Sequence, residues 1–597
     1  MCGITGYVGK NNKCLNILIE GLENLEYRGY DSSGVAYFTN KLNIVKEVGR
    51  IKNLKDKLNL NDATNIGIGH TRWATHGLPK VCNAHPHNTN KITIVHNGII
   101  ENYDKLRDKT FKYSSETDTE VACHLLDVLY NKEKDMLKAI LEFENLAKGS
   151  YAIALLNSDE KDTLYAIKKN SPLIIGVGDN ENFIASDIHA ILKYTNKYIV
   201  LDDYDFAKIT KDKILIYDKN GKLKENIIKE INEDVKDLSK NGFPHFMLKE
   251  INEEPKVIRE TLNCFLNNGK IDFDKYLKGK KIDNILILGC GSAVHAGLIG
   301  KYIIEEYANI PVSVEIASEF RYKKVFVTKN TLVIPISQSG ETADTLKALL
   351  IAKEYNPYTL GIINVFESSI ARCCDDVLYT KAGPEIAVAT TKAYLSQSLI
   401  LILLALYLGL SNKTISKKDY DETIKELLIL PLKLENLLND ENYKKIANII
   451  YKKQDIFFIG RLTDYALCME GSLKLKEISY IHSEAYAAGE LKHGTISLID
   501  KDTYTFAIIT NLGIASKTIS NVKEVKSRYG KIIMVVSDDI EVSCDTYDEK
   551  IVIPKTCEML KPLLAIIPLQ IIAYETAKLK GCDIDKPKNL AKSVTVE

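Results

Sequence analysis

Residues 332–346 read LVIPISQSGETADTL, and this stretch decides the fold that we predict for the second half of the chain. The apolar run 332–336 is typical of a buried strand, and residues 341–347 have the composition of a helix. Between them lies a short turn rich in hydroxyl groups, made of Ser337, Gln338, Ser339 and Gly340. A strand, a tight loop and a helix start direct backbone N–H groups and the positive end of the helix dipole at one point. The stretch therefore predicts an anion site in an α/β domain.

The composition of this turn favours a phosphate monoester as the anion. The stretch lacks the lysine of the nucleotide P-loop, so a nucleoside triphosphate with its magnesium fits poorly. An ordinary βα turn with a single serine cap is the simpler alternative. We prefer the phosphate interpretation because three hydroxyls and a carboxamide crowd one turn, from Ser337, Ser339, Thr342 and Gln338.

The composition limits the class of protein. The chain has 597 residues, enough for three or four domains, and its 79 Lys and Arg balance its 79 Asp and Glu. That balance gives no overall field to attract nucleic acid or an acidic membrane. We expect no secretory signal, and the longest apolar stretch, 399–410, is short for a membrane span and is expected to be a buried helix. Twelve cysteines without C-x-x-C pairs favour reduced thiols in a cytoplasmic protein.

The second half of the sequence contains one unit used twice. Residues 285–292 (ILILGCGS) and 455–463 (DIFFIGRLT) both run from an apolar strand into a glycine turn, and Gly289 aligns with Gly460. Strands alternate with helical stretches in both copies, which predicts two doubly wound α/β domains with parallel sheets. The G-x-G-x-x-G dinucleotide signal fails because residue 294 is valine.

The two copies differ in chemistry. ISQSG at 336–340 matches ITNLG at 509–513, so Ser339 of the first copy faces Leu512 of the second. We therefore expect the first copy to hold the phosphate and the second to supply catalytic groups.

Charged residues recur at helical spacing in the second copy. Glu470, Lys474 and Glu477 lie at i, i+4 and i+7 and share one helix face. A surface salt-bridge ladder is the usual meaning of such spacing, but apolar neighbours favour partial burial. His493, in a glycine-flanked loop, can titrate near neutral pH. In the last ten residues Lys592 lies among apolar anchors, and docking of this tail would lower the lysine pKa toward imine chemistry.

The first half has a candidate nucleophile at position two. Once Met1 is removed, the Cys2 thiol would lie beside an α-amino group that can accept its proton. A chance cysteine is the simpler alternative if only the start of the chain is considered. Downstream, ITIVHNGIIENY (92–103) runs an apolar strand into Asn97 and Gly98, whose amide groups suit an oxyanion hole. Together these residues favour a thiol nucleophile.

Two charged residues in the same half suit an amino acid substrate. Arg72, in IGIGHTRWATHG (66–77), can bind a carboxylate through two hydrogen bonds, and Asp118 can hold an ammonium. The neighbouring Trp73 offers a flat apolar lid. Five of the eleven histidines lie in this region, but their spacing does not fit a zinc site, so we expect them to form hydrogen-bonding walls rather than a metal site: His70, His76, His85, His87 and His96.

These segments resemble, in order and character, the class II glutamine amidotransferase domain with its N-terminal-nucleophile (Ntn) αββα fold. The resemblance rests on MCGITG (1–6), LEYRGYDSSG (25–34), GHTRWATHG (69–77), NAHPHN (83–88), VHNGIIENY (95–103) and SETDTE (115–120). It implies hydrolysis of glutamine to glutamate and ammonia, with Cys2 as nucleophile and its amine as base. By the same resemblance Asn97 and Gly98 would stabilise the oxyanion. The resemblance assigns glutamine binding to Arg72, Thr75, His76 and Asp118, and closure of the site and the ammonia gate to Trp73 and Arg28.

The whole chain resembles the glutamine:fructose-6-phosphate amidotransferase family, in which an amidotransferase domain precedes two sugar isomerase (SIS) domains and a tail with a lysine. Distinctive segments are ASEFRY (317–322), SQSGETADTL (337–346), TKAY (391–394), LKLKEISYIHSEAYAAGELKHG (473–494) and NLAKSVTVE (589–597). The resemblance implies synthesis of glucosamine 6-phosphate from glutamine and fructose 6-phosphate, without cofactor or metal. It also implies a homodimer or higher homo-oligomer through the SIS half, with His493 reaching a neighbouring subunit.

The same resemblance implies a role for each residue of the sugar site. Ser337, Gln338, Ser339 and Thr342 would bind the phosphate, and Ser292, Val388 and Thr390 would contact the sugar. Lys592 would form the imine with C2, His493 would assist ring opening, and Glu477 would move the proton between C1 and C2 with Lys474 beside it. The sequence departs from the family pattern at Ala293, Pro384, Thr390 and Thr495, which leaves the sugar affinity open.

Domain boundaries follow from these segments. We predict an amidotransferase domain at 1–218, a linker at 219–245, a helical lead-in at 246–275, SIS domains at 276–415 and 447–587, and a catalytic tail at 588–597.

Two other functions fit the same fold. One is a different reaction on a sugar-phosphate amine, such as deglycation, with a vestigial first half. The other is a non-enzymatic sugar-phosphate sensor, although we find no helix-turn-helix with a basic face for DNA binding.

Overall fold

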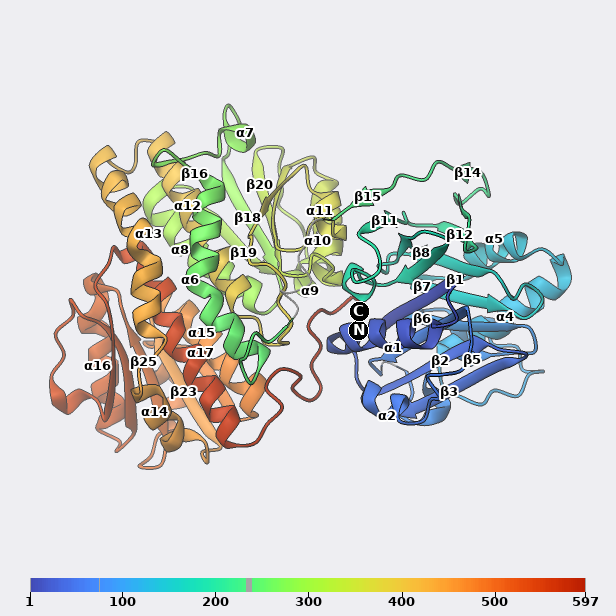
Figure 1. The fold of residues 1–597 in the computed structure, drawn as a ribbon. Helices are drawn as coiled ribbons and strands as arrows, with labels where there is room; N and C mark the ends of the chain where they lie inside the picture. The colour runs from blue at the N-terminus through green and yellow to red at the C-terminus, as the bar shows by residue number, and fades with distance from the viewer. Residues whose placement is uncertain (1, 75, 232–238, 596–597) are drawn as a thin grey trace. The chain divides into compact units, whose positions relative to one another are not determined.

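The structure is a computed structural model that describes residues 2–74, 76–231 and 239–595. The chain divides into two compact units, one of residues 1–237 with 591–597 and one of residues 238–590 (Figure 1). The end of the tail, including Lys592, therefore belongs to the first unit.

The first unit contains two antiparallel sheets. One has the strand order β15 (Lys229–Glu230), β11 (Lys197–Val200), β9 (Ile174–Val177), β10 (Glu181–Ala185), β1 (Gly3–Gly9), β4 (Ile66–Arg72), β2 (Ser32–Phe38) and β3 (Leu42–Val48). The other has the order β14 (Leu223–Lys224), β13 (Ile214–Tyr217), β12 (Asp205–Ile209), β8 (Leu164–Lys169), β7 (Gly149–Asn157), β6 (Ile92–Ile100) and β5 (His87–Asn88). β14 and β15 fall in the range predicted as a linker, and residues 232–238 of that range lie outside the described residues.

Apolar side chains arrange these sheets in four layers. Residues such as Ile68 of β4 and Ala154 of β7 fill the space between the sheets, because alternate side chains of each strand point inward. The outer faces are covered by α1 (Cys14–Leu25) on the first sheet and by α4 (Asp118–Glu133) and α5 (Met136–Leu146) on the second. Short helices α2 (Ile51–Lys55) and α3 (Tyr103–Leu106) complete the unit. This is the predicted αββα arrangement.

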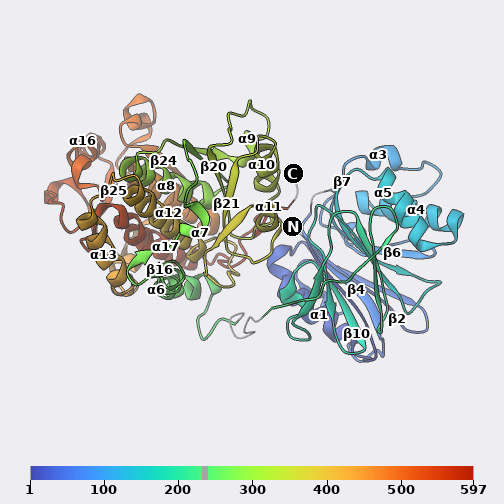
Figure 2. The same cartoon turned by 90° about the horizontal axis from the view of Figure 1, so that it is seen from above.

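The second unit contains two parallel five-stranded sheets with the same strand order. The first has the order β19 (Val312–Ile316), β18 (Asn284–Gly289), β20 (Thr331–Ser337), β21 (Tyr358–Ile363) and β22 (Asp376–Tyr379). The second has the order β24 (His482–Ala487), β23 (Asp455–Gly460), β25 (Tyr504–Ile509), β26 (Lys531–Ser537) and β27 (Glu549–Ile553). Figure 2 shows β20 and β21 side by side in the first sheet. The predicted doubly wound pair is confirmed, because each strand of one copy has its counterpart in the other.

Helices connect the strands of both copies. The first copy has α8 (Ser292–Ala308), α9 (Ala317–Phe320), α10 (Ala343–Lys353), α11 (Ser369–Cys373) and α12 (Lys392–Ser411). The second has α15 (Thr463–Ser479), α16 (Ala515–Lys526) and α17 (Lys561–Leu579), and the remaining helices are α6 (Phe246–Phe265), α7 (Asp274–Leu277), α13 (Lys417–Leu437) and α14 (Asn442–Ile450). A small hairpin of β16 (Leu266–Asn267) and β17 (Lys270–Ile271) follows α6.

One hydrophobic core joins the two copies. It contains apolar residues of both sheets together with α8, α12, α15 and α17. The helices Lys392–Ser411 and Glu558–Leu579 are long and apolar enough to cross a membrane, but 89% and 94% of their apolar windows are buried inside the protein. Residues 399–410 therefore lie in a buried helix, as the sequence predicts.

Candidate functional site

The Cys2 thiol lies against the strand end that carries Trp73. Its Sγ is 3.3 Å from the backbone N of Trp73 and 3.5 Å from the Trp73 carbonyl oxygen. Burial raises the pKa of the thiol, while the Trp73 N–H and the Arg72 guanidinium act to lower it. A buried thiol of raised pKa needs a nearby base to ionise, and the α-amine of a processed chain is such a base.

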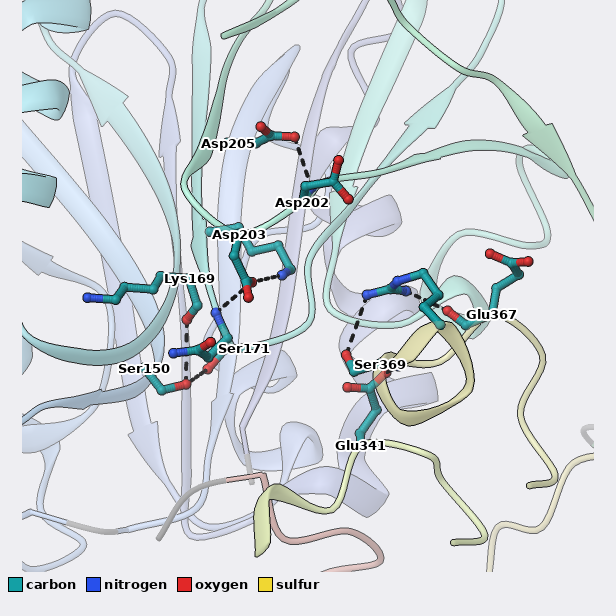
Figure 3. Close-up of polar contacts among 12 residues, drawn as sticks. Ser150, Lys169, Ser171, Asp202, Asp203, Asp205, Glu341, Glu367 and Ser369 are labelled. Carbon is teal, nitrogen blue, oxygen red and sulfur yellow. Dashed lines mark hydrogen bonds and ion pairs between the residues drawn. The ribbon is translucent and has the colours of Figure 1, made fainter. Parts of the chain in front are cut away.

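Asn97 links the middle of the second sheet to the start of the chain. It lies in β6, and its side-chain Nδ2 donates to the carbonyl oxygen of Cys2 at 3.0 Å. The adjacent Gly98 has φ +128°, and a Cβ there would lie 2.0 Å from the Ser150 carbonyl oxygen. The Ser150 hydroxyl in turn forms a hydrogen bond with the Ser171 hydroxyl, at 2.8 Å (Figure 3). Only glycine fits this position.

A buried histidine orients the Asn97 carboxamide. His70 Nε2 lies 3.1 Å from Asn97 Oδ1 and 3.0 Å from the His96 carbonyl oxygen. Both partners are acceptors, so Nε2 carries the proton and donates. This hydrogen bond holds Asn97 Oδ1 at His70, so the Asn97 NH₂ group points at the carbonyl oxygen of Cys2. The sequence predicts His70 only as a wall residue, because nothing local reveals its partner.

Arg72 and Asp118 lie in the same part of the first unit. Arg72 is buried at the end of β4, and its Nη2 donates to the carbonyl oxygens of His76 and Gly77. Its Nη1 is buried with no hydrogen-bond partner in the described part of the chain. Asp118 begins α4 and accepts the Ile100 N–H at 2.8 Å. A guanidinium nitrogen without a partner suits a substrate carboxylate.

Thr75 and His76 are the other two predicted glutamine contacts. Thr75 lies outside the described residues. The His76 ring packs edge-on against Tyr103, with centroids 5.5 Å apart.

The two predicted gate residues have different partners. Trp73 packs edge-on against Tyr30, with ring centroids 6.0 Å apart. Arg28 is buried, and its Nη1 donates to Asp187 Oδ2 at 2.9 Å and to the Ser186 carbonyl oxygen at 3.3 Å. Asp187, 159 residues further along the chain, is a partner that the sequence did not identify.

Four of the predicted wall histidines form a buried cluster. Ring centroids are 4.1 Å apart for His70 and His85, and 5.0 Å apart for His85 and His87. Burial lowers the pKa of all four, to about 3 for His70, so His70, His85, His87 and His96 are neutral at physiological pH. No group of three or more potential metal ligands occurs among the described residues.

In the second unit, the predicted phosphate loop follows β20 as expected. Ser337 Oγ accepts the Gly340 N–H at 2.9 Å and lies 3.1 Å from Thr342 Oγ1. Ser339 Oγ accepts the Glu341 N–H at 3.2 Å. The Glu341 carboxylate accepts the Ser369 N–H at 2.8 Å (Figure 3). The loop is therefore folded by its own hydroxyls, and Gln338 and Ser339 are half-buried at its bend.

Gly340 allows this bend. Its φ is +65°, and a Cβ there would lie 1.8 Å from Ser368 Oγ. Helix α10 begins at Ala343 rather than at residue 341, so all four predicted phosphate ligands lie in the loop or at its end.

The predicted helix face of the second copy contacts the predicted sugar site of the first. Glu470 Oε1 accepts from Ser292 Oγ at 2.9 Å, and Glu470 Oε2 lies 2.7 Å from His295 Nδ1. Lys474 Nζ lies 2.7 Å from Glu477 Oε2, 3.4 Å from Glu470 Oε1 and 3.3 Å from Ser292 Oγ. The site is therefore built where α8 and α15 meet.

Burial excludes the surface-ladder interpretation for this group. Glu470 and Lys474 are 0% exposed. Burial alone would lower the pKa of Lys474, but the Glu470 and Glu477 carboxylates raise it above its ordinary value. Burial alone would raise the pKa of Glu470, but Lys474 and His295 lower it. Lys474 is thus a fixed cation, and Glu477, whose side chain is 19% exposed, is the accessible carboxylate.

The predicted sugar contacts Val388 and Thr390 lie in a loop held by buried carboxylates. Glu250 Oε1 accepts the N–H groups of residues 386 and 387, and Glu385 Oε1 accepts those of residues 391 and 393. Val388 is buried and donates its N–H to the Asp585 carbonyl oxygen at 3.0 Å. The segment that leads to the tail therefore begins beside this loop.

The remaining two predicted residues of the sugar site are His493 and Lys592. His493 is exposed in the short helix Glu490–His493, and no hydrogen bond to Lys474 or Glu477 occurs within the described ranges. Lys592 is half-buried in the first unit.

Comparison with known proteins assigns each half of the chain to a domain family. Residues 82–193 match the glutamine amidotransferase domain family, and residues 279–407 and 449–579 each match the SIS domain family. The chain is 50% identical to the glutamine–fructose-6-phosphate aminotransferase (isomerizing) of Clostridium tetani and 47% identical to that of Clostridium acetobutylicum, over 100% of each chain. It is similar to the solved C-terminal domain of glucosamine-fructose-6-phosphate aminotransferase from Francisella tularensis, with 38% identity and a TM-score of 0.56 over 58% of this chain and 99% of that one. The chain therefore belongs to the family of glutamine–fructose-6-phosphate aminotransferases (isomerizing).

Proposed function

We propose that the chain makes glucosamine 6-phosphate from glutamine and fructose 6-phosphate, releasing ammonia in the first unit and consuming it with the second. The observation that carries this proposal is the contact of Asn97 with Cys2, because it brings an oxyanion donor to the candidate nucleophile. The similarity of the chain, over its full length, to glutamine–fructose-6-phosphate aminotransferases supports the proposal further.

Glutamine hydrolysis follows from the residues around Cys2. The thiol attacks the side-chain amide carbon of glutamine after its proton passes to the α-amine freed by removal of Met1. Asn97 Nδ2 and the Gly98 N–H stabilise the negative oxygen of the tetrahedral intermediate. The protonated amine then gives this proton to the amide nitrogen as the C–N bond breaks, so that ammonia leaves, and water hydrolyses the thioester to glutamate.

Glutamine is held by groups around the thiol. Arg72 binds its α-carboxylate and Asp118 its α-ammonium, while Thr75 and His76 line the pocket. Trp73 and Arg28 close the site and direct ammonia onward, because free ammonia would be protonated in bulk water.

Fructose 6-phosphate is bound by the first SIS copy. Ser337, Gln338, Ser339 and Thr342 hold the phosphate, and Ser292, Val388 and Thr390 contact the sugar. Glu477 moves the proton between C1 and C2, since it is the accessible carboxylate beside a fixed cation. His493 assists ring opening, in keeping with its exposed position in a glycine-flanked loop.

Lys592 forms the imine with C2 of the open-chain sugar. The Asp585 carbonyl is fixed to Val388, and seven extended residues span at most about 25 Å. The tail is therefore long enough to bring the Lys592 amine to the sugar loop. Addition of ammonia to the imine carbon and release of the lysine would leave an imine nitrogen on C2, and proton transfer from C1 to C2 would then give the 2-amino aldose.

The setting of the reaction is a further part of the proposal. We propose a cytoplasmic homodimer or higher homo-oligomer through the SIS half, without nucleic acid or membrane. The burial of both long apolar helices and the balanced charge support this assignment.

A product assay tests the proposal. Glucosamine 6-phosphate and glutamate are measured from glutamine and fructose 6-phosphate with the wild-type chain, Cys2→Ala and Lys592→Ala. Cys2→Ala should lose both products, whereas Lys592→Ala should keep glutamate and lose the amino sugar. Glutamate without amino sugar from the wild type would contradict the proposal.

A further inference from the structure

The two SIS copies differ at one buried position beside the phosphate loop. Helices α8 and α15 have the same length of 17 residues and start at corresponding positions, since Ser292 aligns with Thr463. Their preceding residues have nearly the same backbone conformation, with φ and ψ of 56° and −128° at Gly291 and 52° and −121° at Leu462. The second residue of the helix is Ala293 in the first copy and Asp464 in the second.

Asp464 binds the loop of its own copy from inside the protein. Asp464 is 1% exposed. Its Oδ2 accepts the Thr510 N–H at 2.9 Å and the Asn511 N–H at 3.4 Å, and its Oδ1 accepts from the Thr510 hydroxyl. Two backbone amides and a hydroxyl after a parallel strand are the donors that commonly bind a phosphate group.

The same donors have counterparts in the first copy. The strands β20 and β25 align so that Ser337 corresponds to Thr510 and Gln338 to Asn511. These are two of the four residues proposed to bind the sugar phosphate. In the first copy the residue aligned with Asp464 is Ala293, whose methyl side chain carries no charge and cannot accept these N–H groups.

We infer that the Asp464 carboxylate takes the place of the phosphate in the second copy, so that sugar phosphate binds only to the first. The inference rests on the proposed phosphate site at Ser337–Thr342. A carboxylate and a phosphate compete for the same N–H groups, and a second anion in that place would meet like-charge repulsion.

Burial raises the pKa of the Asp464 carboxyl to about 6, while the hydrogen bonds from Thr510 and Asn511 act to lower it, so the group carries its charge at neutral pH. Lys561 is 0% exposed, and its Nζ donates to the Thr510 carbonyl oxygen at 2.9 Å. The same Nζ lies 3.0 Å from Asp539 and 2.7 Å from Glu558. The single charge of Lys561 therefore stands against three carboxylates at this loop, those of Asp464, Asp539 and Glu558, and this excess negative charge would repel an incoming phosphate dianion.

Binding stoichiometry of the wild-type chain is the first test. Equilibrium dialysis with labelled fructose 6-phosphate should give one bound sugar per chain. Two bound sugars per chain would overturn the inference. Absence of binding, or binding unchanged in Ser339→Ala, would instead overturn the proposed function on which the inference rests.

A pair of substitutions of equal size but different charge in the first copy is the second test. Ala293→Asp should raise the KM for fructose 6-phosphate at least about ten-fold through repulsion of the phosphate. Ala293→Asn has the same size without the charge and should raise it less than about three-fold. Equal effects of both variants would show a purely steric role and would overturn the inference. Thermal unfolding of each variant, followed by far-UV circular dichroism and compared with the wild type, reports that the second unit is folded.

Removal of the internal carboxylate is the third test. Asp464→Ala should unfold at a lower temperature than the wild type. Added inorganic phosphate should raise the unfolding temperature of Asp464→Ala more than that of the wild type. No extra gain from phosphate in a folded Asp464→Ala chain would overturn the inference. If that variant does not fold, the stoichiometry and the Ala293 pair decide the question.

Discussion

Val388 donates its backbone N–H to the carbonyl oxygen of Asp585 at 3.0 Å. The Asp585 carboxylate also accepts the N–H groups of Phe246 and Met247, at 2.9 and 3.0 Å, where α6 begins. One residue therefore ties the proposed sugar loop, a helix start and the segment before the tail together. The position from which the chain runs toward Lys592 is set by these three bonds.

Asp585→Ala should weaken sugar synthesis more than glutamine hydrolysis. The substitution removes an acceptor from two N–H groups at a helix start, which costs about 1–2 kcal/mol of stability. The tail then begins from a less fixed point, so the rate of glucosamine 6-phosphate formation should fall while glutamate formation persists. Lys580→Ala, an exposed change on the same segment, is the control. A proportional loss of both products would contradict this role.

Gly340→Ala should weaken sugar-phosphate binding. The substitution places a Cβ 1.8 Å from Ser368 Oγ at a φ of +65°, so the loop has to move. Gly279→Ala is a matched control, since Gly279 has a φ of +76° but nothing within 4 Å of its Cβ. Both variants lose about 1 kcal/mol for the left-handed backbone, but only Gly340→Ala should raise the KM for fructose 6-phosphate. A normal KM in Gly340→Ala would show that the loop is not the phosphate site.

His70→Leu should lower kcat of glutamine hydrolysis with little change in KM. Without the Nε2–H donor, the Asn97 carboxamide loses its fixed orientation and stabilises the oxyanion less well. We expect a loss of about ten- to one-hundred-fold, less than removal of an oxyanion donor itself. His70→Gln keeps an N–H donor and should recover part of the rate. Equal activity of His70→Leu and the wild type would exclude a positioning role for His70.

The first unit should lose stability as the pH falls below about 6.5. In the unfolded chain each histidine has a pKa near 6.5, whereas burial lowers the folded pKa of His70, His85, His87 and His96. The unfolded state therefore binds more protons, and each histidine contributes at most about 1.4 kcal/mol of lost stability per pH unit between 6.5 and its own folded pKa. Glu144, whose pKa burial raises to about 8, acts in the opposite direction, but it is one group against four.

Urea unfolding measures this pH effect. Trp73 is the only tryptophan of the chain, so its fluorescence reports on the first unit. The unfolding free energy should fall by roughly 2–3 kcal/mol between pH 7 and 5.5, and the fall should be steeper in Glu144→Gln. A free energy that is unchanged or higher at pH 5.5 would contradict the neutral histidine cluster.

Local patterns predicted the parts of the site that lie on one element. The helix face of Glu470, Lys474 and Glu477 follows from spacing alone, and the loop after β20 follows from a strand, a glycine and hydroxyl residues. The predicted start of α10 was two residues early, because Thr342 keeps an extended backbone and serves as the N-cap. Such end effects depend on the loop contacts rather than on helix propensity.

The contacts between distant segments could not be predicted in this way. Ser292 and Glu470 are 178 residues apart, and Arg28 and Asp187 are 159 apart. Periodicity shows which face of a helix is apolar, but it does not show which other element covers that face. For the same reason His70 was expected only as a wall residue, and its bond to Asn97 depends on the pairing of two sheets.

The Ser292–Glu470 bond also has an evolutionary meaning. Duplicated domains often drift apart, and one of them becomes dispensable once the other does the work. Here the hydroxyl comes from the first copy and the carboxylate from the second, so deletion of either copy would destroy the pair. Both copies are therefore needed for this pair, even though only the first has the hydroxyl-rich loop.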